Sequence, residues 1–153
     1  MNLNIKTVAE KEDFIDHIDT LKESLFNEKH NLTQTLRSGK NPYSAFIKTL
    51  LQREGIPEKD RNAVKTALGK IENELKRLRT INFTIAFEPN EQIIKAIYSW
   101  AEKNLNEKVI LNIEVKPEIL GGVIMTSSGF YNDFSLVKKI EEVSIEKILK
   151  QND

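Results

Sequence analysis

Alternation of apolar and polar residues near position 110 constrains the fold of this chain more than any other feature. Apolar residues hold positions 109, 111, 113 and 115, and polar residues hold positions 112, 114 and 116. A period of two predicts a β-strand that buries one face. Pro117 has no N–H to donate to a strand ladder, so the strand should end there.

Two shorter strands and a helix are predicted to follow. Apolar residues at 123–125 and an aromatic pair at 130–131 predict the strands, and the Ser-Ser-Gly sequence at 127–129 predicts the turn between them. Asp133 and Ser135 are candidate caps of a last helix, because short polar side chains accept hydrogen bonds from a first helical turn.

The glycine pair Gly121-Gly122 stands at the start of the second strand. It lacks the lysine and further glycines of a phosphate-binding loop, and it lacks the spacing of a dinucleotide-binding fold. A bulge or a close approach of two backbone segments accounts for glycine at a strand start. We therefore interpret the pair as structural.

The first 80 residues carry helical patterns. Apolar residues at three-and-four spacing predict a first helix that continues to Leu36, and 42–54 predicts a short second helix. A third helix carries apolar residues at steps of four and three over 64–78, a stripe too short for an independent coiled coil.

A strand and a further helix precede the alternating strand. Residues 83–87 alternate, and 91–105 carry a helical apolar face. We expect the inner face of this helix to consist of Ile93, Ile97, Trp100 and Ala101, with Ile94 and Leu105 flanking it.

These elements predict an α+β fold. Strand, helix and strand indicate a parallel pair with a right-handed crossover, and the next two strands should continue as a meander. Because the sheet is apolar mostly on one side, both helices should cover that side. The expected organisation is a region of about three helices over 1–80, followed by a small βαβββα-like domain over 81–153 with a mixed sheet covered by two helices.

Composition excludes several classes of function. The sequence has no cysteine, which excludes disulfides, thiol catalysis and cysteine-ligated metals. Its formal net charge is zero, so no global field favours nucleic acid or a membrane surface. No apolar run approaches the roughly 20 residues of a membrane span, and the first residues lack the apolar core of a signal peptide.

No catalytic, metal-binding or cofactor-binding set is recognisable, so we expect a protein that is not an enzyme and needs no cofactor. His17 and His30 lack the spacing of a metal-binding helix, and the serines at 127–128 do not form a nucleophile elbow. Basic residues over 61–79 have no aromatic neighbours for base stacking. They favour a solvated face or an acidic protein helix over nucleic acid.

The order of elements resembles the F-type ATP synthase delta subunit family, which includes the mitochondrial oligomycin-sensitivity-conferring protein. The likeness begins near Thr84, and the matching motifs are Val115-Lys116-Pro117, the Ile-Leu-Gly-Gly-Val-Ile sequence at 119–124, Asp133-Phe134-Ser135 and Lys138-Lys139-Ile140. Phe134 stands where the family usually has glycine. The N-terminal half is shorter than the helical bundle of the family.

This resemblance implies a noncatalytic peripheral-stalk (stator) subunit of a rotary, hydrogen-ion-transporting ATP synthase. It implies that the N-terminal region binds the N-terminal helix of the alpha subunit in the catalytic head. It also implies that the domain over 81–153 binds the C-terminal helix of the b-type stalk subunit. The protein would then lie on the cytoplasmic side of the inner or cell membrane, attached only through the complex.

Two groups of residues follow from the motifs and the helical patterns. The expected structural residues are Pro117, Gly121, Gly122, Asp133 and Ser135. The expected partner contacts, which include apolar residues outside one tidy stripe, are Ile94, Tyr98, Leu105, Phe134, Val137 and Ile145.

Two alternative functions remain open from the sequence. One is an E-type peripheral-stalk subunit of a V/A-type ATPase, which also pairs an N-terminal helix with a Gly-Gly-containing α/β domain. The other is a free-standing adaptor that binds protein or nucleic acid, because a fold alone does not fix a function.

Overall fold

The computed structural model describes residues 5–26, 36, 41–105 and 107–150. The described part is α+β, as predicted, with helices before a mixed four-stranded sheet.

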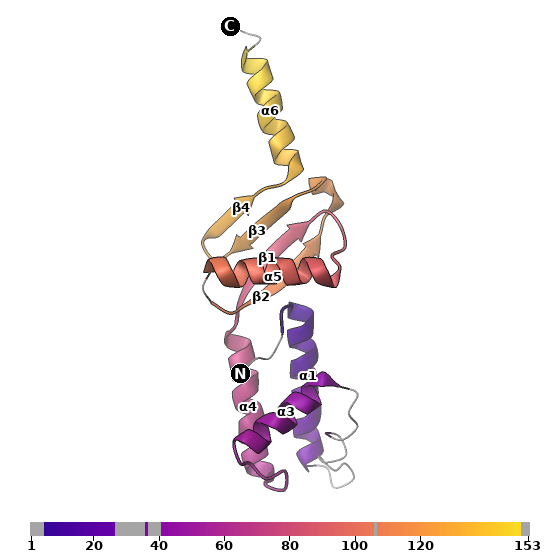
Figure 1. Ribbon diagram of the computed structural model, residues 1–153, viewed down its shortest axis with the longest axis vertical. Coiled ribbons are helices and arrows are strands. Elements are labelled where there is room, and N and C mark those ends of the chain that lie inside the picture. The colour runs from indigo at the N-terminus through magenta and orange to yellow at the C-terminus, as the bar shows by residue number, and fades with distance from the viewer. Residues whose placement is uncertain (1–4, 27–35, 37–40, 106, 151–153) are drawn as a thin grey trace. The chain divides into compact units, whose positions relative to one another are not determined.

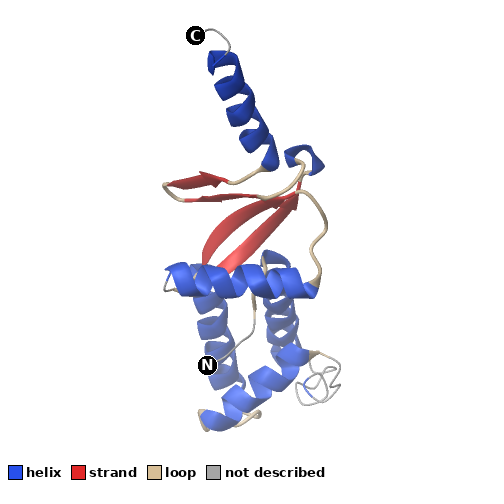
Figure 2. Ribbon diagram, turned by 45° about the horizontal axis from the view of Figure 1, so that its top comes forward, coloured by secondary structure: helices blue, strands red, loops and turns tan. Residues whose placement is uncertain are grey.

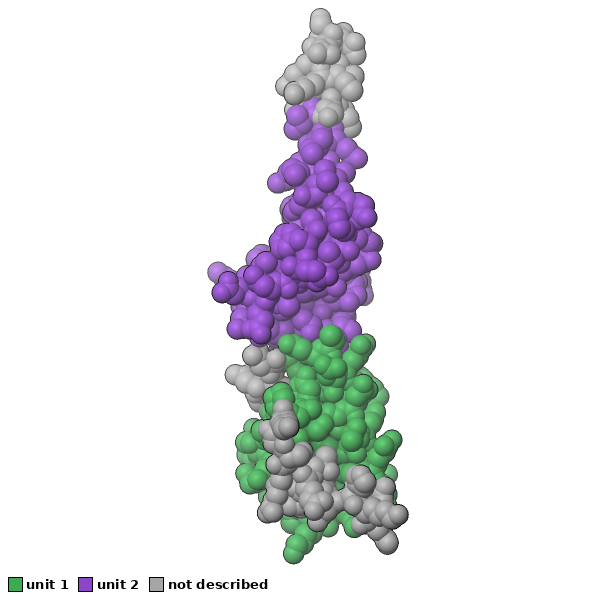
Figure 3. All heavy atoms as spheres, turned by 90° about the vertical axis from the view of Figure 1, so that its right-hand side faces the viewer, with its two compact units in different colours: residues 1–5, 9–78 green, residues 6–8, 79–153 purple. Residues whose placement is uncertain are grey.

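The chain divides into two compact units, which Figure 3 colours separately. Unit 1, the helical unit, comprises Met1–Ile5 and Ala9–Leu78. Unit 2, the sheet unit, comprises Lys6–Val8 and Arg79–Asp153. A short N-terminal stretch of the sequence thus belongs with the sheet rather than with the helix that follows it.

The helical unit contains α1 (Val8–Phe26), α3 (Pro42–Arg53) and α4 (Arg61–Arg77), labelled in Figure 1. The described part of α1 ends at Phe26, and the predicted continuation toward Leu36 falls largely on 27–35, outside the described residues. Helices α3 and α4 have side-chain caps, because Asn41 Oδ1 accepts the Tyr43 amide at 2.8 Å and Asp60 Oδ1 accepts the Ala63 amide at 3.0 Å.

Apolar stripes of these three helices form the core of the helical unit. The ring of Phe14 stacks on that of Tyr43, with centroids 4.5 Å apart. The three-and-four stripe of α4 is core rather than a coiled-coil seam, because Val64, Leu68 and Leu75 are all buried.

An ion-pair network also joins α1 to α4. Lys22 pairs with Glu72 of α4 and, at 3.2 Å, with Asp19 of its own helix. Glu72 also pairs with Lys76. The Lys22 and Glu72 side chains are only 22% and 15% exposed, so water screens their attraction less than it screens a surface pair.

The sheet unit follows α4 with almost no linker. Its elements are β1 (Arg79–Ile85), α5 (Glu91–Leu105), β2 (Val109–Val115), the short 3-10 helix η1 (Pro117–Ile119), β3 (Val123–Ser127), β4 (Phe130–Asp133) and α6 (Leu136–Lys150). The strand order is β2-β1-β3-β4, and Figure 2 shows the strands in red.

The order of the strands corrects the predicted meander. Strands β1 and β2 are parallel, as expected, but β3 pairs antiparallel with β1 instead of continuing from β2. The far edge of β2 is occupied: Leu111 N–H donates to the Lys6 carbonyl at 2.7 Å, and Thr7 forms a parallel bridge with Leu111. Strands β3 and β4 then form a hairpin.

Helix α5 lies across one face of the sheet (Figure 1), rotated slightly from the predicted orientation. The residues that pack on the core cluster of Ile81, Phe83 and Leu111 are Ile94, Ile97, Tyr98, Ala101 and Leu105. Trp100, predicted as core, is 43% exposed and meets Phe83 only edge-on, with ring centroids 6.5 Å apart. Because Ile93 and Ile94 are adjacent, as are Trp100 and Ala101, the sequence allows two helical faces with three-and-four spacing. The face that packs on the sheet is the one that contains Ile94 and Ala101.

Helix α6 does not lie beside α5 on the apolar face, where both helices were expected, and it does not cover the opposite face either (Figures 1 and 2). That face carries two cross-strand rows, Asn112-Asn82-Thr126-Tyr131 and Glu114-Thr84-Ile124-Asp133. Because these rows are mostly polar, covering them would bury unpaired polar groups. Helix α6 instead runs on past the end of the sheet (Figures 1 and 2).

Candidate partner-binding site

The glycine pair brings two backbone segments of the sheet unit together. Gly122 has φ +77°, and a Cβ there would lie 3.0 Å from the Phe134 carbonyl carbon and 3.2 Å from Ser135 Cα. The Phe134 amide donates to the Val123 carbonyl, and the Leu136 amide donates to the Gly121 carbonyl, both at 2.9 Å. The turn into α6 therefore packs directly against the two glycines. Pro117, the other expected structural residue of this region, is the first residue of the short helix η1.

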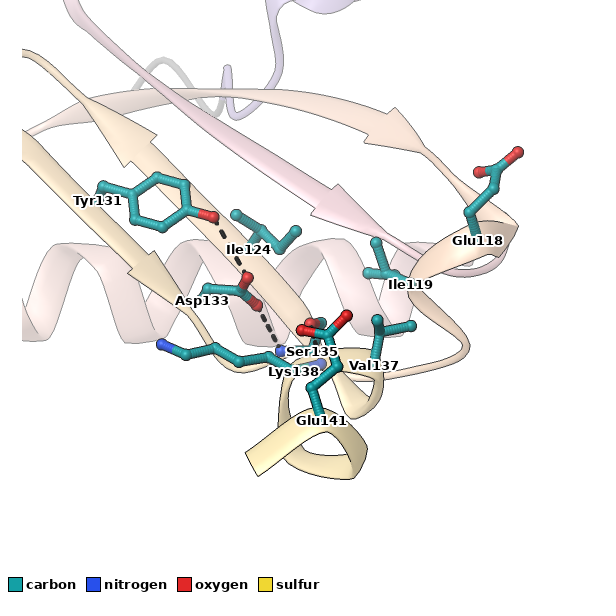
Figure 4. A pocket seen from close by; sticks show the side chains of 9 residues that line it. All are labelled: Glu118, Ile119, Ile124, Tyr131, Asp133, Ser135, Val137, Lys138 and Glu141. Atoms are coloured by element: carbon teal, nitrogen blue, oxygen red, sulfur yellow. Dashed lines mark hydrogen bonds between the residues drawn. The ribbon is translucent and has the colours of Figure 1, made fainter. Parts of the chain in front are cut away.

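Asp133 and Ser135 shape the turn into α6. Ser135 Oγ accepts the Lys138 amide at 3.2 Å, which is the bond of an N-cap. Asp133 Oδ1 accepts the Ser135 amide at 2.8 Å, as Figure 4 shows. Hydrogen bonds from the Ser135 hydroxyl and amide hold the pKa of Asp133 below its usual value. Both side chains thus act on the backbone of the turn.

A hollow of about 430 Å³ opens between the polar sheet face and the start of α6. Its lining, drawn in Figure 4, is Glu118, Ile119, Ile124, Tyr131, Asp133, Ser135, Val137, Lys138 and Glu141. Apolar atoms come from the sheet and η1, while Lys138 and the two glutamates supply charge of both signs. Such a lining suits an amphipathic segment better than a small charged metabolite.

Exposed apolar side chains occupy the side of α6 that faces away from this hollow. Leu136, Ile140 and Val143 of α6 are 44%, 49% and 53% exposed and recur at steps of four and three along the helix. Phe134 is 51% exposed just before the helix, and Leu120 is 62% exposed beside η1. We call Leu136, Ile140 and Val143 the α6 stripe. A stripe of this spacing presents one continuous apolar face.

The predicted contact residues separate into two groups. Phe134 and Val137 lie at the hollow or its border, whereas Ile94, Tyr98 and Leu105 pack inward against the core of the sheet unit. Tyr98 is therefore more buried than Trp100, the reverse of the expectation. The side chain of Ile145 lies outside the described residues.

Sequence reasoning missed the sheet side of the hollow. Ile124 and Tyr131 line it, and neither was among the expected structural or contact residues. The signal was present in part, because Ile124 is the one apolar residue on the otherwise polar face of β3. The hollow itself depends on α6 leaving the sheet, which local patterns do not encode.

The polar side chains inside the described part of the chain take part in structural hydrogen bonds. The described residues contain no cluster of three or more metal-ligating side chains and no buried side-chain polar atom without a hydrogen-bond partner. His17 is held in a structural network: its Nε2 lies 2.9 Å from Ser44 Oγ, and Asn41 Nδ2 lies 3.4 Å from its Nδ1. Burial lowers the pKa of His17. His30 lies outside the described residues.

The helices that the structure describes also include none long and apolar enough to cross a bilayer.

Comparison with known proteins identifies the family. The family model described as "ATP synthase delta (OSCP) subunit" matches residues 3–146. No curated protein matches the sequence closely enough to count as a relative.

Two solved structures are similar in part. A chain of the Polytomella F-ATP synthase is 20% identical, covering 49% of this chain and 99% of that one, with a TM-score of 0.42. A chain of the Toxoplasma gondii mitochondrial ATP synthase hexamer is 11% identical, covering 90% of this chain and 87% of that one, with a TM-score of 0.39. The family match over nearly the whole sequence is the decisive finding: the chain belongs to the ATP synthase delta (OSCP) subunit family, and is a noncatalytic peripheral-stalk subunit of an F-type ATP synthase.

Proposed function

We propose that the chain is the connector between the catalytic head of a rotary ATP synthase and its membrane-anchored stalk. Membership of the delta family over 3–146 carries this proposal, and it disfavours the E-type alternative. Division into two compact units suits a connector with two partners. Such a protein resists torque through helix-in-groove contacts and needs no reactive pocket.

The sheet unit is the proposed binding site for the stalk. Its partner would be an amphipathic helix at the C-terminal end of the b-type subunit, seated along the α6 stripe. Fully burying one leucine or isoleucine side chain contributes about 1.5–3 kcal/mol, so cover for three exposed apolar residues supports stable docking.

The helical unit is the proposed binding site for the head. Its partner would be the N-terminal helix of the alpha subunit. The outer face of α4 supports an acidic partner, because Arg61, Lys65, Lys70 and Arg77 are all exposed. Assembly of both contacts would hold the protein at the cytoplasmic side of the membrane, with no membrane contact of its own.

Binding of two synthetic peptides to the full chain tests the proposal. One peptide carries the C-terminal helix of the b-type subunit from the same organism, and the other carries the N-terminal helix of its alpha subunit. Calorimetry should show that both peptides bind. The substitution Val143→Asp should weaken the binding of the stalk peptide and leave that of the alpha-subunit peptide unchanged. Phe26→Asp is the matched control, since Phe26 is 58% exposed on α1 and outside the proposed stalk site.

The adaptor alternative makes an opposite prediction in the same format. If the chain is such an adaptor, a labelled single-stranded RNA should bind to it. The affinity should fall as the salt concentration rises, because phosphate contacts release counterions. Binding of RNA together with failure of both peptides would refute the connector. Failure of the stalk peptide alone would refute the assignment of the sheet unit.

A further inference from the structure

The hollow beside the start of α6 is a surface of the sheet unit that the proposed stalk helix would leave open. Val137 and Glu141 line it and lie about one helical turn apart on the same side of α6. The α6 stripe begins at Leu136, one residue earlier and therefore about 100° away around the helix. A helix seated on the stripe thus leaves room for a second partner at the hollow.

The floor of the hollow is apolar. Ile119 of η1 is buried, and Ile124 of β3 and Val137 of α6 are half-buried. These three side chains come from three different elements and line one space of about 430 Å³. A space of this size is large enough for a long side chain with an aliphatic stem.

Two of the charges beside this floor offset each other. Asp133 accepts hydrogen bonds from the Ser135 amide at 2.8 Å and from the Tyr131 hydroxyl at 3.2 Å. Hydrogen bonds from Ser135 hold the pKa of Asp133 below its usual value, and the positive charge of Lys138 adds to this effect. Asp133 and Lys138 therefore contribute no net charge to the hollow.

Glu118 and Glu141 supply the charge that remains. Both residues are exposed, and no ion pair within the described part of the chain includes either carboxylate. In the view of Figure 4, the side chains of Ile119 and Val137 lie between Glu118 on η1 and Glu141 on α6. The hollow thus combines an apolar floor with two uncompensated negative charges.

We propose that this hollow binds an arginine side chain, flanked by apolar residues, from a segment of a second partner protein. The aliphatic stem of the arginine lies on Ile119, Ile124 and Val137. Its guanidinium donates to the carboxylates of Glu118 and Glu141, which a forked donor matches better than the ammonium of lysine does. The same two charges repel the phosphates of a nucleic acid, so the occupant is a protein segment.

An NMR titration of the full chain with short peptides tests this site. The probe is the capped peptide acetyl-Ala-Leu-Arg-Leu-Ala-amide, and two counterparts carry lysine or the neutral arginine analogue citrulline at the centre. The arginine peptide should shift the backbone amide signals of Ile119, Ile124 and Val137. The lysine peptide should bind more weakly, and the citrulline peptide most weakly. Absence of shifts at the hollow, or equal affinity for arginine and citrulline, overturns the proposal.

Neutral variants locate the charges that bind the peptide. Glu118→Gln and Glu141→Gln should each raise the Kd of the arginine peptide by about two- to fivefold, the effect of losing one exposed ion pair. The matched control is Glu142→Gln, which removes the same charge from the next residue of α6, outside the lining. Its Kd should equal that of the unaltered chain. Equal weakening in all three variants would show a general attraction by negative charge and would overturn the site.

Competition with the stalk peptide separates this site from the proposed connector function. The arginine peptide should bind with the same Kd whether or not the stalk peptide is present. Displacement of the arginine peptide by the stalk peptide would overturn the assignment to a second partner. Failure of the stalk peptide to bind, with the shifts at the hollow retained, would refute the stalk site and leave the arginine site intact.

Discussion

Gly122 lies against the backbone of Phe134, so close that a Cβ on the glycine would overlap the Phe134 carbonyl oxygen. The contact connects the start of β3 with the entry to α6. It fixes the direction in which α6 leaves the sheet, and hence where the hollow forms. The conformation of Gly122, with φ +77°, reinforces the requirement for glycine.

Substitution of Gly122 by alanine should destabilise the sheet unit more than the same change at Gly129. Both glycines have φ +77°, but a Cβ at Gly129 meets nothing within 4 Å. Gly129→Ala should cost only the left-handed backbone, about 1–2 kcal/mol. Gly122→Ala should cost about 1–3 kcal/mol more, because the overlap forces the backbone to shift. Denaturant unfolding measures both, and equal costs would disprove the close approach.

Removal of the cap of α6 should loosen this helix. Ser135→Ala deletes the acceptor of the Lys138 amide and should cost about 0.5–2 kcal/mol. Thermal melts followed by circular dichroism would measure the loss, and Ser135→Thr should restore most of it. Ser128→Ala, in the exposed β3–β4 turn, is the control. A melt equally unaffected by both alanine changes would argue against a capping role.

The Lys22–Glu72 pair should be coupled more strongly than an exposed ion pair. A double-mutant cycle with Lys22→Met and Glu72→Gln should give a coupling energy of about 0.5–3 kcal/mol. The comparison pair is Glu91–Lys95 on α5, 3.7 Å apart with side chains 89% and 61% exposed. Its cycle should give about 0.3–0.5 kcal/mol. The reverse ranking would show that partial burial does not strengthen the network.

Acid should destabilise the helical unit through His17. Burial lowers the pKa of His17 in the folded chain below its unfolded value of about 6.5, so the folded state favours neutral imidazole. The contribution of neutral His17 to the free energy of unfolding is then fully present above a pH of about 6.5. It decreases as the pH falls below that value and stops changing below the folded pKa. Because Asn41 Nδ2 faces Nδ1, the added proton also lacks an acceptor there.

Denaturant midpoints at pH values of about 7.5 and 5.5 bracket this titration while most carboxylates stay ionised. The unaltered chain should lose stability between them, and His17→Gln should lose less. His30→Gln removes the other histidine and should retain the full dependence. An identical pH dependence in the His17 and His30 variants would exclude His17 as its source.

Local patterns in the sequence carried much of the fold. Helix α3, the α4 stripe and the parallel β1–β2 pair follow from spacing and from turn residues. The orientation of α5 did not follow, because Ile93 and Ile94, and Trp100 and Ala101, are adjacent apolar choices. Only contact with the sheet selects between them, and that contact is nonlocal.

Long-range pairing accounts for the remaining differences. The place of β3 beside β1 depends on an edge of β2 that is occupied by residues about a hundred positions earlier in the sequence. The exposure of the α6 stripe depends on the polar rows of the sheet, which are recognisable only once the strand order is known. The glycines and the capping residues beside the candidate site were accordingly predicted from the sequence, whereas Tyr131 and Ile124 were not predicted to line it.

The passage from α4 to β1 is the shortest joint in the chain, since Leu78 alone separates a helix from a strand and already has extended angles, φ −62° and ψ 129°. A residue deleted here would therefore have to come from the last turn of α4 or from the first ladder pair of β1, Arg79 with Val109. A change of chain length in this part of the sequence is absorbed more cheaply at a turn such as Gly55-Ile56-Pro57.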